Sequence, residues 1–145
     1  MTKIYTIGFT KTSAEGFFER VRKAGVRKIV DVRLNNTSQL SGFAKAADLK
    51  YFLREILDVD YQHLPGLAPT DEILSAYRKG SMSWNEYEKR YIDLIRGRKV
   101  EKLLDRSSMA DSCLLCSEDK PHRCHRRLVC EYLDSEWGGV RALHL

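Results

Sequence analysis

The first third of the chain alternates between strand-like and helix-like segments, and this alternation constrains the fold more than any other feature. Residues 4–7 form a short β-rich run. An amphipathic segment follows, in which Thr12 and Glu15 have the spacing of a capping box and Gly25 is placed to end a helix. Residues 28–33 have the apolar character of a second, buried strand. This order predicts a βαβ unit and therefore parallel strand pairing.

Further helices are predicted in the middle of the chain. Apolar residues repeat at helical spacing over residues 47–57. Thr70 is expected to cap a short helix that extends through Tyr77, and Ser83 with Glu86 forms a second capping box. These segments supply helices that can cover a sheet.

Three more strands complete the predicted sheet, at residues 61–64, 112–116 and 140–145. We therefore expect residues 1–145 to form a single α/β domain, with a mainly parallel sheet of about five strands flanked by helices. A chain of 145 residues is long enough to bury a stable core without disulfides or a structural metal.

Composition narrows the cellular setting and the partners. No apolar run approaches the roughly 20 residues of a membrane helix, and the start of the chain lacks the apolar core of a secretory signal, so a cytoplasmic protein without a membrane partner is expected. In that reducing compartment cysteines are expected to be free thiols, ligands or redox groups. The net charge is +5, but only residues 120–127 form a compact basic group, which favours a local anionic partner.

That basic group coincides with all four cysteines, between the strand at 112–116 and a helix-like run at 128–133. Ligands of parallel α/β sheets bind at the carboxyl ends of the strands. The residues expected to converge there are Thr10, Asp31, Arg33, His63, and the segment from Cys116 to Arg126. The sequence thus predicts a site at this edge of the sheet.

A helix that begins near Cys124 and His125 would direct free N–H groups and a positive dipole into the turn, and Arg126 adds formal charge. This combination favours phosphate or carboxylate binding. It also lowers the pKa of a thiol at the helix start, which makes Cys124 the better reactive thiolate and Cys116 the second thiol. Cys113 and Cys130 are more simply interpreted as core residues.

Several chemistries compete for these groups. In a phosphatase-like or sulfurtransferase-like loop five residues separate the cysteine from an arginine, whereas six separate Cys116 from Arg123 here. Cys116, His122, Cys124 and His125 are acceptable zinc ligands, but the spacing does not favour a zinc site, so no cofactor is predicted. A Cys116–Cys124 redox pair stays open. Glu118 and His125 are an alternative acid/base pair.

The chain resembles the family known as domain of unknown function 488. The resemblance covers nearly all of it and is carried by three groups of residues near the strand ends. These are Thr6 to Gly8 and Val30 to Arg33; Ser41, Phe43, Leu49, Leu53 and Tyr61, with His63 to Pro65; and Leu115, Cys116, Glu118, Pro121 and Cys124 to Arg126.

The resemblance implies a single α/β domain and marks a set of signature residues, but it brings no established reaction. The signature comprises Asp31, Arg33, Cys116, Glu118, Cys124, His125 and Arg126. The chain departs from the family pattern at residues 35–39, where relatives often carry prolines and a Ser-Arg pair, and at residues 66–68, where they are acidic and glycine-rich.

Two hypotheses follow. The first is an enzyme acting on an anionic substrate, either phosphate-bearing or derived from nucleic acid. Its catalytic residues would be Cys116, Glu118, Cys124 and His125, and its substrate-binding residues Asp31, Arg33, Arg126 and Thr10. The alternative is a noncatalytic nucleic-acid-binding module that uses the same basic edge plus exposed aromatic residues. Trp84, Tyr87 and Tyr91 recur at helical spacing, which favours core or lid packing, with base stacking as their role if they are exposed.

Overall fold

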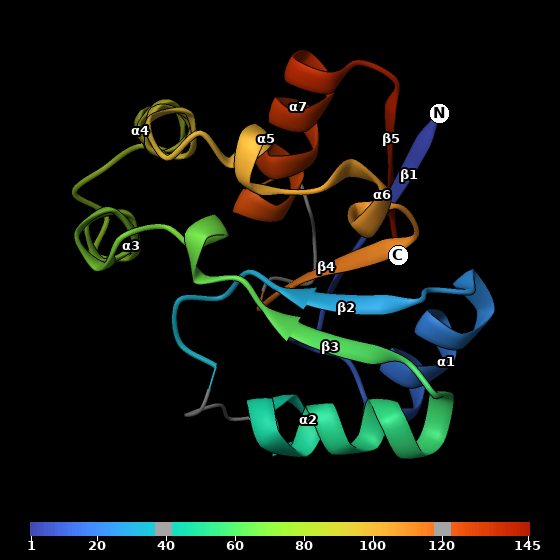
Figure 1. Cartoon of the computed structure of the whole chain (residues 1–145). Coiled ribbons are helices and arrows are strands. Elements are labelled where there is room, and N and C mark those ends of the chain that lie inside the picture. The colour runs from blue at the N-terminus through green and yellow to red at the C-terminus, as the bar shows by residue number, and fades with distance from the viewer. Residues whose placement is uncertain (37–41, 118–122) are drawn as a thin grey trace.

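The computed structural model describes residues 1–36, 42–117 and 123–145. A five-stranded sheet runs through the molecule in the order β3-β2-β4-β1-β5, and all its neighbouring strands are parallel (Figure 1). The strands are β1 (Thr2–Gly8), β2 (Lys28–Asp31), β3 (Asp60–His63), β4 (Ser112–Cys116) and β5 (Val140–His144). The predicted α/β fold with a parallel sheet of five strands is confirmed.

The register of the central strands brings their carboxyl ends to one level. Gly8 of β1 lies opposite Cys116 of β4, and Asp31 of β2 lies between Leu115 of β4 and His63 of β3. Side chains that are far apart in the sequence therefore meet at one edge of the sheet.

Helices cover both faces of the sheet (Figure 1). One face packs against α1 (Ala14–Ala24), α2 (Ala46–Phe52) and the π-helical turn Leu53–Leu57 that continues α2. The other face packs mainly against α4 (Trp84–Gly97), α5 (Val100–Leu103) and α7 (His125–Trp137).

Shorter elements connect these layers. They are α3 (Asp71–Arg78), α6 (Arg106–Met109), and the 3₁₀ turns Gly42–Ala44 and Pro65–Leu67. The helix α3 packs beside α4 at the carboxyl end of the sheet (Figure 1). At this position it can form one side of a site there. Among the described residues, none of the helices has the length and apolar character needed to cross a membrane.

Three helix starts were predicted from capping residues, and two of them are confirmed. Thr70 accepts a hydrogen bond from the backbone N–H of Ile73, and Ser83 accepts one from that of Glu86. The prediction of Thr12 as the cap of α1 is wrong by one residue, because the side chain of Ser13 accepts from the N–H of Gly16.

The hydroxyl of Thr12 is engaged elsewhere. It donates to the carbonyl of Thr10 at 3.3 Å and lies 3.1 Å from Nη2 of Arg20. At the other end of α1, Gly25 adopts the left-handed conformation at φ 72°, so the predicted helix stop is confirmed.

Candidate functional site

A cavity of about 250 Å³ opens at the carboxyl edge of the sheet. Its walls come from the ends of β2 and β4, the start of α7, and the helices α3 and α4, which lie beyond the strand ends (Figure 1). The residues that carry its chemistry are Arg33, Arg78, Cys116, Arg123, Cys124 and His125. The sequence predicted a site at this edge, and four of its proposed residues, Arg33, Cys116, Cys124 and His125, line this cavity.

The cavity contains a pair of sulfur atoms. Cys116 is the last residue of β4, Cys124 is the N-cap residue of α7, and the structure joins them by a disulfide. The sequence left this pairing open, because no pattern shows how the turn between the two residues folds. The arrangement joins the sheet to the start of α7 by a bond that a thiol reductant can open.

Arg126 lies behind Cys116 rather than in the cavity wall. Its side chain is fully buried, and Nη1 donates to Sγ of Cys116 at 3.4 Å. A guanidinium beside a cysteine favours the thiolate over the thiol. Arg126 thus contacts Cys116 and is not among the residues that line the cavity, and the anion-binding role expected of it from the sequence stays a prediction.

His125 is held as a neutral imidazole. Nε2 lies 2.7 Å from the carbonyl of Val32 and donates to it, which leaves Nδ1 as the acceptor, 3.9 Å from Sγ of Cys124. Burial lowers the pKa of His125 to about 4; the hydrogen bond to Val32 opposes this shift and the charge of Arg126 adds to it. The ring is thus placed to accept a hydrogen bond from a Cys124 thiol.

Arg33 is fixed by a buried ion pair with Asp31. Nε and Nη2 of Arg33 each donate to a carboxylate oxygen of Asp31 at 2.8 Å, and the hydroxyl of Tyr61 donates to the same carboxylate at 2.5 Å. Burial alone would raise the pKa of Asp31, but the hydrogen bonds and charge of Arg33 and the Tyr61 hydroxyl lower it overall.

This pair presents Arg33 to the cavity while Asp31 lies outside the cavity wall. Nη1 of Arg33 is buried and has no hydrogen-bond partner within residues 1–36, 42–117 and 123–145. Asp31 therefore positions Arg33 at the cavity, and the substrate-binding roles of both residues stay predictions.

Thr10 supports the loop that carries the site. Its hydroxyl and its backbone N–H both donate to the carbonyl of Ser117, the residue after Cys116, and Ser117 lines the cavity. Glu118, predicted as a catalytic residue, lies outside the described residues.

The other two cysteines lie in the core, as interpreted from the sequence. Cys113 packs on the face of the sheet covered by α1, whereas Cys116 belongs to the opposite face, as their spacing on one strand requires. Burial raises the pKa of Cys113 above that of an ordinary thiol and that of Cys130 to about 12. Both are inert thiols.

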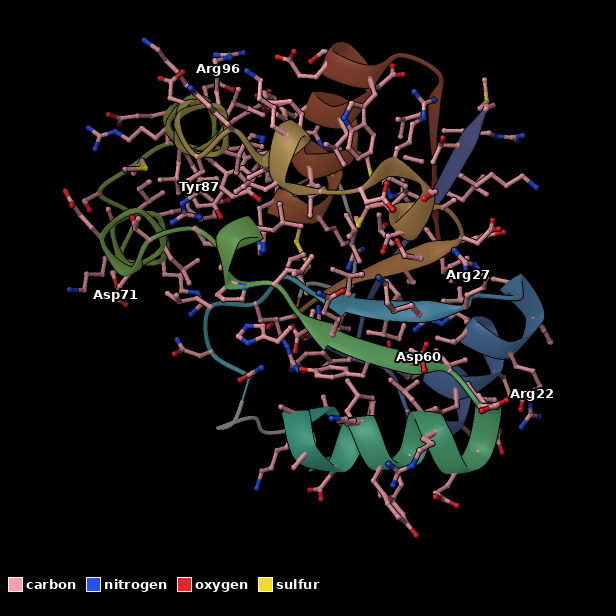
Figure 2. The ribbon with its side chains drawn as sticks, in the orientation of Figure 1. Arg22, Arg27, Asp60, Asp71, Tyr87 and Arg96 are labelled. Carbon is pink, nitrogen blue, oxygen red and sulfur yellow. A yellow bond between two sulfur atoms is a disulfide. The ribbon has the colours of Figure 1, made fainter. Side chains whose placement is uncertain are left out.

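An aromatic wall lies on the opposite side of the cavity, and from the sequence its residues Trp84 and Tyr87 were assigned to a site only in the nucleic-acid-binding alternative, as exposed aromatics. Tyr77 of α3 meets Trp84 and Tyr87 of α4, and the rings of Trp84 and Tyr87 stack with centroids 5.1 Å apart. Figure 2 shows Tyr87 between α4 and α3. The helical spacing of Trp84, Tyr87 and Tyr91 indicated core or lid packing, or base stacking if exposed, and Tyr91 is fully buried.

Arg78 was also missed. It follows Tyr77 on α3 and is exposed at the cavity rim. No pattern in the sequence distinguishes it from the other charged residues of a surface helix. Within the described ranges, no cluster of three or more His, Cys, Asp or Glu side chains is arranged to hold a metal ion.

The structure thus defines a parallel α/β domain with a sulfur-containing, arginine-lined cavity at its carboxyl edge. Comparison with known families identifies it further. The sequence profile described as "Domain of unknown function DUF488" matches residues 13–133, and the chain belongs to this family. No significant match was found among curated proteins or among solved structures. The matched range includes Asp31, Arg33 and the whole Cys116–Arg126 segment, whereas Thr10 lies before it.

Proposed function

We propose that this protein is an enzyme that binds an anionic, phosphate-bearing substrate in the cavity and attacks it with the thiolate of Cys116. The observation that carries the proposal is that Cys116 and Cys124 line the same cavity as Arg33 and Arg123. The sulfur of a nucleophile and the cations for an anion are thus within one small space.

The chemistry requires the dithiol form. Two-electron reduction of the disulfide by a thiol reductant yields two thiols. The charge of Arg126, 3.4 Å from Sγ, then stabilises Cys116 as the thiolate. This thiolate forms a bond to the electrophilic atom of the substrate, and the leaving group departs with its electron pair.

The neighbouring groups have distinct tasks in this scheme. Nδ1 of His125 accepts a hydrogen bond from the Cys124 thiol and so keeps Cys124 protonated beside the Cys116 thiolate. Because His125 is neutral at physiological pH, it does not add a positive charge to the site. Arg33 and Arg123 bind the anionic group of the substrate. Glu118 is assigned to proton transfer on sequence grounds.

Alkylation of the reduced protein tests the proposal. In a Cys124→Ser variant, which cannot re-form the disulfide, iodoacetamide should modify Cys116 with a pH midpoint at least about one unit below the roughly 8.5 of a free thiol. Cys113 and Cys130 serve as internal controls, since burial raises the pKa of each. Mass spectrometry of the peptides measures each rate.

Inorganic phosphate should slow the modification of Cys116, and Arg123→Ala should weaken that protection. Arg22→Ala is the matched control, because Arg22 is an exposed arginine of α1 that does not line the cavity. Figure 2 shows it far from Tyr87, a residue of the cavity wall. Modification of Cys116 no faster than that of Cys113 would show that it is not the nucleophile.

A noncatalytic nucleic-acid-binding module is the second candidate, and the aromatic wall beside Arg78 and Arg123 favours it. Base stacking on aromatic rings together with a basic groove is how many proteins hold single strands. Binding of an oligonucleotide that falls steeply with salt and is unchanged by Cys116→Ser would favour the module over the enzyme.

A further inference from the structure

We infer that the ligand of the cavity carries an aromatic ring beside its phosphate, and that it belongs to the class of mononucleotides. This inference rests on the proposed function for its anion site and adds the identity of the rest of the ligand. It is carried by the two unlike ends of the cavity, one cationic and one aromatic.

The cationic end is defined by Arg33. Its side chain is only 2% exposed, yet Nη1 lines up with no acceptor in the described parts of the chain while Nε and Nη2 are both occupied by Asp31. The ion pair fixes the plane of the guanidinium, and Phe9 packs against it with its ring centroid 5.3 Å from Cζ. Because Arg33 lines the cavity, the charge of this fixed guanidinium attracts a phosphate there.

The start of α7 adds to this end. The helix has 13 residues and its N-cap residue, Cys124, makes no side-chain capping hydrogen bond. Cys124 and His125 line the cavity, so the first turn of α7 faces the same space as Arg33. The partial positive charge of a helix N-terminus favours a phosphate there.

The aromatic end is formed by Tyr77, Trp84 and Tyr87. Tyr77 and Trp84 are half-buried, and all three residues line the cavity. Leu74 and Pro69 extend the same wall, which makes it apolar as well as aromatic. Contact with such a surface does not stabilise the binding of a bare phosphate. Packing on aromatic side chains does stabilise the binding of a nucleobase.

The size of the cavity selects a monomer. Its volume of about 250 Å³ lies just below the range of about 300–1,000 Å³ that is usual for sites of drug-sized ligands. The cavity therefore has room for one small molecule rather than for several successive bases of a strand. In a mononucleotide, the phosphate would lie at the cationic end beside Arg33 and the base at the aromatic end beside Trp84.

Calorimetric titration of the reduced wild-type protein with adenosine 5′-monophosphate, ribose 5-phosphate and adenosine tests the inference. The mononucleotide should bind about tenfold or more tightly than either fragment, since stacking on one aromatic residue contributes about 1–3 kcal/mol per base. Trp84→Leu should lower the affinity for the mononucleotide to that for ribose 5-phosphate. The affinity for ribose 5-phosphate itself should not change. Trp137→Leu is the matched control, because Trp137 packs against Arg106 and Glu101 away from the cavity.

The cationic end is tested separately. Arg33→Lys keeps the charge but loses the planar guanidinium that Asp31 holds in place, and it should weaken the binding of both phosphate ligands about tenfold without changing the binding of adenosine. Arg123→Ala, at an exposed position, provides the same test if the Arg33 variant does not fold.

The outcomes separate this inference from the proposed function. If ribose 5-phosphate binds as tightly as the mononucleotide and Trp84→Leu changes neither, the ring is not recognised, although the anion site of the proposed function stands. If no phosphate ligand binds, the anion site fails and this inference fails with it. If a single-stranded oligonucleotide binds more tightly than the mononucleotide and with a steep salt dependence, the ligand is a strand and the inference is wrong.

Discussion

The stability of the protein should fall as the pH is lowered toward 5, because His125 is buried in its neutral form. Burial lowers the pKa of this histidine from 6.5 to about 4, and the nearby charge of Arg126 acts in the same direction. Between these two pH values the unfolded chain binds a proton at this position and the folded protein does not. The free energy of unfolding therefore decreases as the pH falls through this window.

The size of the effect follows from the two pKa values. At about pH 5, protonation of an ordinary histidine stabilises the unfolded chain by RT ln(1 + 10^1.5), which is about 2 kcal/mol. Protonation stabilises the folded protein very little at that pH, because a pKa of about 4 keeps His125 neutral. Measurement near pH 5 also keeps most carboxylates ionised in both states. Burial lowers the pKa of His144 as well, so comparison of wild type with a variant at position 125 isolates the contribution of His125.

Urea denaturation of wild type and of His125→Gln at about pH 7 and pH 5 measures this contribution. Glutamine retains an N–H donor for the carbonyl of Val32 but does not titrate, so the loss of stability between the two pH values should be smaller by about 2 kcal/mol in the variant. His63→Gln is the matched control, since half-buried His63 also contacts a carbonyl, that of Arg33, at 2.9 Å. An unchanged pH dependence in His125→Gln would refute the neutral, buried state of the ring.

Two further substitutions test the structure around the site. Asp31→Asn should lower the free energy of unfolding by about 3–5 kcal/mol, because it leaves the buried guanidinium of Arg33 without its anion. Chemical denaturation measures this loss, and a value below about 1 kcal/mol would contradict a desolvated ion pair. Ser83→Ala should lower the free energy of unfolding by about 1 kcal/mol, because it removes the N-cap of α4. Asn85→Ala, at an exposed position of the same turn, should lower it less, and equal losses in the two variants would argue against capping.

The sheet could be predicted from the sequence because its strands are short apolar runs between clear breaks. β4 is the best example, since every residue from Ser112 to Cys116 is buried. Parallel pairing followed from the helix between the first two strands. The start of α1 was misplaced because Thr12 and Ser13 are both good caps; Ser13 caps the helix, whereas the Thr12 hydroxyl accepts from Arg20 of the same helix.

The cationic and sulfur-containing half of the site could also be predicted, because parallel strands bring their carboxyl ends together whatever their separation in sequence. Arg33 and Cys116 are each placed there by strand register. The position of the aromatic half could not, although Trp84 and Tyr87 were candidates for base stacking, since their place at this cavity depends on how α3 and α4 pack across that edge. The periodicity of Trp84 and Tyr87 specifies an apolar helix face but not which surface that face covers.

The four cysteines show why position in the fold, rather than residue type, decides reactivity. All four are at most 3% exposed, so desolvation acts against the thiolate at each of them. At Cys113 and Cys130 this effect dominates and the pKa rises. At Cys116 the full charge of Arg126 lies 3.4 Å from the sulfur, in the same buried environment. The helix start that favoured Cys124 on sequence grounds carries only about half an elementary charge. The direct contact with Arg126 therefore supports the proposal that Cys116 is the thiolate of the reduced pair.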